Sequence, residues 1–87
     1  MDVAQEIHQR LTVLQPELCD LDDDSAAHQG HAGAAGGGGH YTLTIVSAAF
    51  VGKNRVARHR QVYDLLQDLM PHTIHALALK TYAPGEI

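Results

Sequence analysis

Apolar residues recur with a helical period at the start of the chain. They are separated by four, four and three positions, which places them on one face of a helix: Val3, Ile7, Leu11 and Leu14. Asp2 is suited to cap the first turn, and Pro16 ends the helix because the residue before a proline avoids the helical conformation. The pattern predicts a helix from Asp2 to about Leu14.

Three stretches show the shorter period of a strand. The strongest is Tyr41–Ser47, in which apolar side chains alternate with threonines. A weaker alternation predicts a short first strand at Glu17–Asp22, and a third strand is predicted at Ile74–Lys80. The first two strands are expected to pair antiparallel, as a hairpin with a long loop.

A second helix is predicted over Arg55–Met70, after a turn in which Phe50 packs inward and Gly52 permits the chain to reverse. Asn54 is placed to cap this helix and Pro71 to end it. By the three-and-four spacing rule its apolar stripe consists of Val56, His59, Val62, Tyr63, Leu66, Leu69 and Met70. The side chains that lie off the stripe are those of Arg55, Arg58, Gln61 and Asp68.

The predicted order of elements is helix, strand, strand, helix, strand. Because a helix crosses between the second and third strands, these two strands must be parallel and their connection right-handed. The result is a mixed three-stranded sheet with both helices on one face, an α/β (α+β) fold. With 87 residues, the chain is long enough for one small domain, residues 1–87, and too short for two.

The chain has a single cysteine, Cys19, so it can form no internal disulfide, which fits a reducing compartment. We expect this thiol to be half-buried and unreactive. No apolar run is long enough to span a bilayer, and Met1–Glu6 does not resemble a signal peptide. We therefore expect a location in the bacterial cytoplasm, or in a plastid, a mitochondrion or the cytosol of a eukaryote, without secretion or membrane contact.

Charge is distributed unevenly along the chain, whose net charge is −4. Residues 1–24 hold seven acidic residues and one basic residue, whereas residues 53–60 hold four basic residues and no acid: Lys53, Arg55, Arg58 and Arg60. This basic cluster suits an acidic partner or a phosphate backbone, although a solvated helix face is the simpler interpretation. The acidic half argues against tight binding to long nucleic acid.

A loop rich in glycine and histidine is predicted over residues 24–40, and its composition predicts flexibility. It carries His28 and His31, with His40 at its end, and a histidine-rich composition is a hint of metal binding. It is not a phosphate loop, because no Gly-Lys-Ser/Thr follows it. The carboxylates of residues 22–24 suggest a divalent-metal or hydrolytic site, but a solvated acidic turn is the favoured interpretation.

Three motifs occur in order along the chain. An Asp-Ser pair opens the histidine-rich loop; Val46-Ser47 is then followed by Phe50-x-Gly52-Lys53 and by Arg58-His59-Arg60; and residues 74–79 read Ile-His-Ala-Leu-Ala-Leu. Together they resemble the signatures of the BolA family over nearly the whole chain. The resemblance implies a fold similar to that of class II KH domains.

The resemblance also implies a partner and a cofactor. Proteins of the BolA family pair with monothiol glutaredoxins and share a bridging 2Fe–2S cluster. The cluster-binding histidine of the family corresponds to His75, and the second ligand to His31, with His28 as the second choice; His40 matches a recurrent histidine at the end of the loop. The remaining ligands are implied to be the glutaredoxin cysteine and its bound glutathione. Two histidines can indeed replace two cysteines on one iron of such a centre.

Simpler interpretations stand beside these. In a strand, His75 can be a hydrogen-bonded structural histidine; the loop histidines can be solvated; and His59 is expected to pack into the core. A function of another class is nucleic-acid binding through the basic cluster, which the resemblance implies for some members of the family. The turn at residues 52–55, however, lacks the second glycine of the KH Gly-x-x-Gly loop. We expect a non-enzymatic protein that is monomeric when alone, with a metal-dependent nuclease as a remote alternative.

Overall fold

The computed structural model describes residues 2–24 and 39–87 of the chain. The predictions for His28 and His31, and most of the predicted flexible loop, fall on residues 25–38 and so lie outside the described residues. Within the described ranges, neither helix combines the length and the apolar character that a membrane crossing requires.

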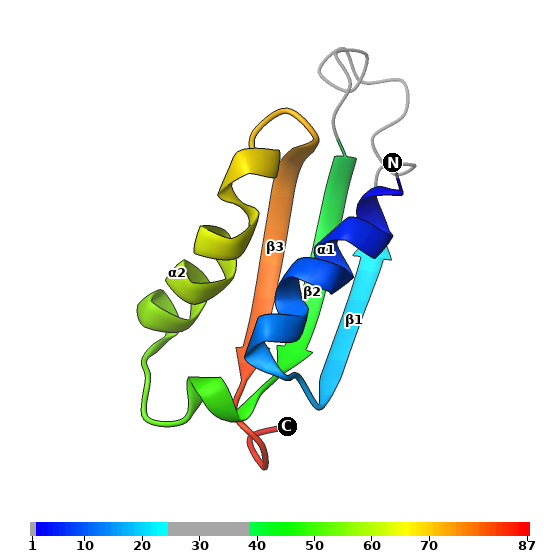
Figure 1. The fold of residues 1–87 in the computed structure, drawn as a ribbon. Coiled ribbons are helices and arrows are strands. Elements are labelled where there is room, and N and C mark those ends of the chain that lie inside the picture. The colour runs from blue at the N-terminus through cyan, green and yellow to red at the C-terminus, as the bar shows by residue number, and fades with distance from the viewer. Residues whose placement is uncertain (1, 25–38) are drawn as a thin grey trace.

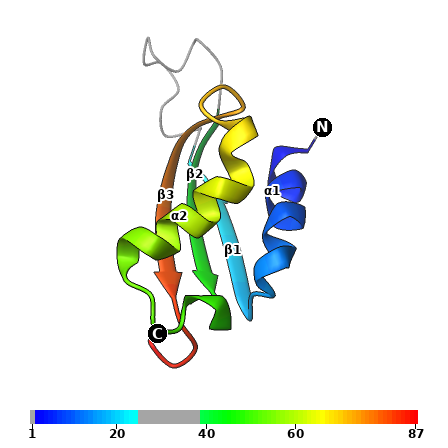
Figure 2. The same cartoon turned by 60° about the vertical axis from the view of Figure 1, so that its left-hand side comes forward.

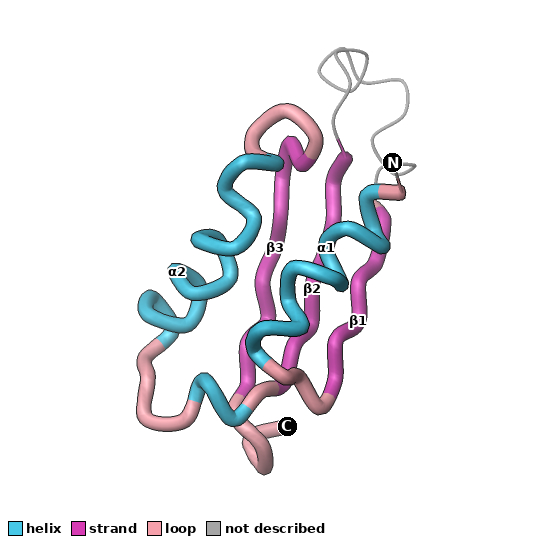
Figure 3. The backbone as a smooth tube through the Cα atoms, in the orientation of Figure 1, coloured by secondary structure: helices cyan, strands magenta, loops and turns pink. Residues whose placement is uncertain are grey.

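The sheet has three strands in the order β1-β2-β3 (Figures 1 and 3). They are β1 (Leu18–Asp23), β2 (Gly39–Val46) and β3 (Ile74–Tyr82). β1 pairs antiparallel with β2, and β2 pairs parallel with β3. The predicted mixed sheet is therefore confirmed. β1 is shifted by one residue toward the C-terminus, β2 begins two residues earlier and ends one residue earlier than predicted, and β3 continues two residues further.

Two helices cover one face of this sheet and leave the other face open (Figure 2). α1 (Val3–Leu11) begins where Asp2 accepts a hydrogen bond from the amide of Gln5, and α2 (Arg55–Leu66) begins where Asn54 accepts one from the amide of Ala57. Both α-helices end earlier than predicted. The remaining turns tighten into 3₁₀ helices, η1 (Thr12–Leu14) and η5 (Gln67–Leu69).

The core lies between the helices and the sheet. Its fully buried side chains come from every layer: Ile7, Leu11, Leu43, Ile45, Phe50, Val62, Leu66 and Ile74. Because residues of β2 alternate between the two faces, Tyr41, Leu43 and Ile45 point into this core. Removal of each large apolar side chain from water contributes about 1.5–3 kcal/mol to folding, so this cluster is the main source of stability.

Ser47 fastens the end of β2 to the rest of the fold. Its buried hydroxyl donates to the carbonyl of Leu14 at 2.5 Å and accepts from the amide of Ala49 at 3.0 Å, and its own amide donates to Tyr82. It caps the short 3₁₀ helix η4 (Ala48–Phe50), which delivers Phe50 into the core as predicted. The serine of the Val-Ser motif is thus a structural residue.

The predicted apolar stripe of α2 is wrong at its first turn. Val56 is 65% exposed, whereas the side chain of Arg58 is only 12% exposed. Positions 58, 62 and 66 share a face of the helix, since they are spaced by four residues. Val62 and Leu66 on this face meet the core, but the first turn extends past the core to the end of β3, where a long polar side chain fits better than valine.

Candidate functional site

Two histidines lie side by side where β2 and β3 begin. The ring centroids of His40 and His75 are 5.2 Å apart, and their planes are inclined by 49°. His75 is exposed and His40 is half-buried. An exposed imidazole beside a second one offers ring nitrogens to a metal-bearing partner. We call the part of the molecule formed by His40, His75 and Asp24 the histidine end.

An irregularity in strand pairing positions His75. Gly39 is paired with Ile74 and His40 with Ala76, so His75 is the extra residue of β3 at this step. Such a bulge changes the direction of a side chain relative to the regular ladder. Gly39 also donates its amide to Thr73 at 3.1 Å, and a Cβ at position 39 would collide with the ring of Tyr41. A glycine here therefore leaves room for the ring of Tyr41, two residues further along β2.

Asp24 ties the end of β1 to the same place. Its amide donates to the carbonyl of His40 at 2.7 Å, and its carboxylate accepts a 2.6 Å hydrogen bond from the hydroxyl of Thr42. Both ends of the segment that carries His28 and His31, Asp24 and Gly39, consequently lie beside the paired histidines. A shallow pocket of about 360 Å³ opens here, lined by Asp24, His40, Tyr41, Thr42, Ala76, Leu77 and Ala78.

The described residues offer no complete metal site of their own. No three of their histidine, cysteine, aspartate or glutamate side chains are grouped so as to hold an ion. Cys19 is half-buried, as predicted, and burial, followed by the charge of Asp20, raises the pKa of its thiol. A raised pKa disfavours the thiolate that binds metals. Any metal at the histidine end must therefore draw further ligands from another molecule or from residues outside the described ranges.

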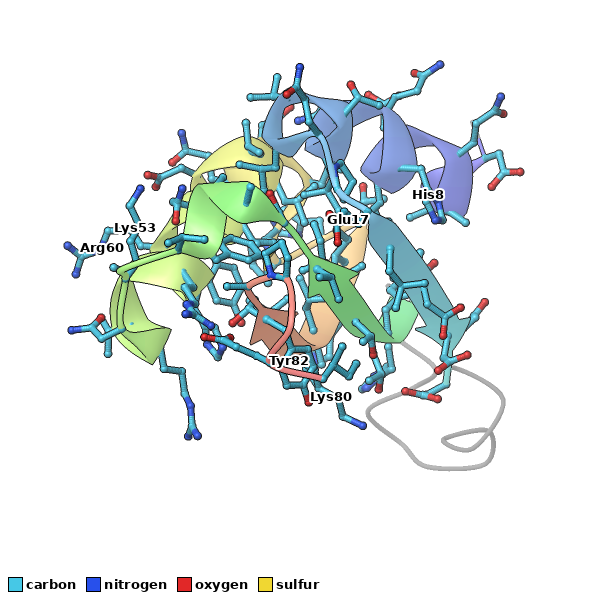
Figure 4. The ribbon with its side chains drawn as sticks, turned by 90° about the horizontal axis from the view of Figure 1, so that it is seen from below. His8, Glu17, Lys53, Arg60, Lys80 and Tyr82 are labelled. Carbon is cyan, nitrogen blue, oxygen red and sulfur yellow. The ribbon has the colours of Figure 1, made fainter. Side chains whose placement is uncertain are left out.

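The predicted basic cluster divides into two parts. Lys53, Arg55 and Arg60 are exposed, as a nucleic-acid or partner surface requires. Seen from below, Lys53 and Arg60 project on the side of α2, apart from Lys80 and Tyr82 of β3 (Figure 4). Arg58, by contrast, is engaged within the fold, and the prediction that it lies on the solvent side of the helix is wrong. We call the part of the molecule where α2 begins beside the last residues of β3 the basic end. It contains Lys53, Arg55, Arg58 and Arg60.

Arg58 makes contacts with three segments. Its Nε donates to the carbonyl of Lys53 at 2.7 Å and its Nη1 to the carbonyl of Thr81 at 3.3 Å. The outer edge of the guanidinium meets the carboxylate of Glu86 in a bidentate ion pair of 2.6 and 3.0 Å. This pair, together with the amide of Ala83, lowers the pKa of Glu86 to about 2. The sequence gives no indication of the role of Glu86, because no motif predicts a contact between a terminal turn and a helix.

A pocket of about 470 Å³ surrounds this ion pair. It is lined by Arg55, Arg58, His59, Leu79, Lys80, Thr81, Tyr82 and Glu86. His59, which the apolar stripe predicted to lie in the core, is half-buried and faces this pocket. The helix start carries polar residues at its inward positions because no core lies beneath it.

Comparisons with known proteins identify the family to which the sequence is similar. A family model described as BolA-like protein matches residues 11–86. SufE-like protein 1 of Arabidopsis thaliana, named as chloroplastic/mitochondrial, is 43% identical over 79 residues, which are 85% of this chain and 21% of that protein. This chain thus spans about a fifth of that plant protein.

A bacterial relative is similar over a larger share of its own length. A protein of Haemophilus influenzae named DNA-binding transcriptional regulator BolA is 34% identical over 99% of this chain and 82% of its own. Among solved structures, the BolA domain of SufE1 from Arabidopsis thaliana superposes with a TM-score of 0.84 at 38% identity, covering 100% of this chain and 98% of that one. Neither relative bears the name of an enzyme.

Proposed function

Because the chain belongs to the BolA family, we propose that it binds a monothiol glutaredoxin and shares a bridging 2Fe–2S cluster with it. In this role it takes part in iron–sulfur cluster transfer or in iron and redox regulation. It acts by binding, without a catalytic step of its own. The observation that carries the proposal is the exposed His75, turned out of the strand ladder beside His40.

The side chains at the histidine end fit such a cluster. Imidazole nitrogens ligate iron in 2Fe–2S centres, and the only cysteine of the chain has a thiol whose raised pKa disfavours ligation. The cluster supplies the redox chemistry, and thiolates of the glutaredoxin and its glutathione supply the other ligands. His75 binds on this side. The second ligand comes from His31 or His28, whose segment begins at Asp24, hydrogen-bonded to His40, and ends at Gly39, paired with Ile74.

The test is a titration with a monothiol glutaredoxin, iron, sulfide and glutathione, followed by visible absorption and circular dichroism. We expect a heterodimer whose spectrum differs from that of the glutaredoxin homodimer and changes again in His75→Ala. His72→Ala is the matched control, because His72 is also exposed but lies in the turn before β3. A spectrum that stays that of the glutaredoxin alone, with no complex formed, would end the proposal.

Nucleic-acid binding is a second candidate, favoured by the name of the Haemophilus relative and by the exposed Lys53, Arg55 and Arg60. These residues would contact phosphates, so each neutral substitution should weaken binding to all sequences and reduce the salt dependence by about one counterion. Fluorescence anisotropy with labelled DNA at several salt concentrations measures this. Binding by His75→Ala should equal that of the native chain, which separates the two candidates.

A further inference from the structure

The pocket at the basic end has the composition of an anion site. Three of its lining residues carry a fixed positive charge, Arg55, Arg58 and Lys80, against one carboxylate, that of Glu86. Leu79 and Tyr82 add apolar and aromatic surface to the same wall. Ligand pockets typically have volumes of about 300–1,000 Å³, a range that includes the 470 Å³ found here. The pocket is distinct from the histidine end, since it lies at the opposite end of β3.

Arg58 is held ready to bind an oxyanion. The carbonyls of Lys53 and Thr81 fix its guanidinium from behind, and this leaves the outer fork to face the pocket. The fork of an arginine matches the two oxygens of a carboxylate or phosphate, and such bidentate pairs are among the stronger hydrogen bonds in proteins. Because the side chain is already immobilised, a ligand that meets the fork loses little affinity to ordering it.

In this structure the carboxylate of Glu86 binds the outer edge of the Arg58 guanidinium. Its two oxygens take the positions that a ligand carboxylate or phosphate would take, at 2.6 and 3.0 Å from the guanidinium nitrogens. Glu86 is 44% exposed and belongs to the short turn after β3, in which its side chain also accepts from the amide of Ala83. Moving this side chain away from Arg58 breaks its hydrogen bond with the amide of Ala83 but removes no apolar side chain from the core.

We propose that the pocket binds a small molecule bearing a phosphate or carboxylate group, which displaces Glu86 from Arg58. Arg55 and Lys80 contribute further positive charge, and Tyr82 contacts the remainder of the ligand. Glu86 is therefore an internal competitor that lowers the affinity of the empty pocket for weak anions. A long polyanion is disfavoured because residues 1–24 carry seven acidic groups, whereas a compact anion meets only the pocket.

The test is a titration of the ¹⁵N-labelled full chain with inorganic phosphate and, in parallel, with succinate. Backbone amides of Leu79–Tyr82 and the Nε–H of Arg58 should shift together and saturate. Glu86→Gln keeps the side-chain shape but removes the competing charge, so affinity should rise about two- to fivefold, the range expected for an exposed ion pair. Glu17→Gln is the matched control, since Glu17 is exposed and does not line the pocket.

Arg58→Gln and Lys80→Gln should each weaken the binding of phosphate. Lys80→Gln is included because Lys80 is exposed, so its substitution leaves the fold intact. Saturation by phosphate alone assigns a phosphorylated ligand, and saturation by both anions assigns the wider class that includes carboxylates. The proposal is overturned if shifts are spread over the surface without saturation, or if Glu86→Gln and Glu17→Gln behave alike. Binding only to single-stranded DNA, with neither small anion, overturns it in favour of nucleic acid.

Discussion

At the histidine end, where β2 and β3 begin, His40 and His75 lie beside the completely buried Ile74. At the basic end, where the same strands finish, Arg58 is held by backbone carbonyl groups and by the carboxylate of Glu86. The histidine end is thus rooted in the apolar core, whereas the basic end is organised by polar contacts at the surface. The difference teaches that a small sheet can support one site by apolar packing and another by polar contacts that a ligand can replace.

The largest effect is expected from Ile74→Ala. This substitution removes a fully buried side chain next to His75 and should lower the free energy of unfolding by about 2–5 kcal/mol. Urea denaturation measures the change, with Ile74→Val, expected to cost about 0.5–1.5 kcal/mol, as the graded control. Equal stability of the two variants would show that the histidine end does not depend on the core.

A smaller loss is expected from Ser47→Ala near the basic end. The substitution leaves the buried carbonyl of Leu14 without its hydroxyl donor, which should cost about 1–3 kcal/mol. Thr44→Ala, at a half-buried position on the open face of the sheet, should change stability by only about 0.5 kcal/mol and serves as the control in the same thermal denaturation. A Tm for Ser47→Ala equal to that of Thr44→Ala would contradict the role of the hydroxyl.

The ion pair at the basic end should make stability depend on pH. The pKa of Glu86 falls from its ordinary value of 4.5 to about 2 in the folded chain, so the folded state binds this proton less readily than the unfolded state. The contribution of the pair is therefore present above about pH 4.5 and is lost as the pH falls toward about 2. Thermal denaturation of the native chain should show a steeper loss in this window than that of Glu86→Gln; parallel curves would refute the assignment.

The smallest effect on stability is expected from His75→Ala. An exposed side chain outside the core can be truncated at a change of about 0.5 kcal/mol or less, so the Tm should stay nearly constant. If the proposed function holds, the same variant changes the visible spectrum of the glutaredoxin complex. A marked loss of stability, as in Ile74→Ala, would instead assign His75 a structural role.

The fold could be predicted because its signals are local and agree with one another. The periods of the two helices, the caps Asp2 and Asn54, and the alternation in β2 each point to the observed element, and the crossover rule then determines the topology. The resemblance of three motifs to the BolA family was likewise sufficient to identify the family to which the chain belongs.

The details of the basic end could not be predicted in the same way. A list of apolar spacings assigns Val56 to the inner side of α2, but the side chain that points inward depends on where the core ends beneath the helix. Arg58 faces inward because it finds Thr81 and Glu86 there, and these are far from it in sequence. The bulge that turns His75 toward His40 depends on strand register, which no local pattern in this chain specifies.

The crossover through α2 also has a kinetic consequence. His40 and His75 are 35 positions apart in the sequence, and they meet only after β2, α2 and β3 have assembled, because parallel strands cannot pair without the full connection. Contacts of such sequence separation form late and slowly in folding. An incompletely folded chain does not present the two imidazoles together, so a ligand that needs both selects molecules that have completed their fold, and its binding stabilises them.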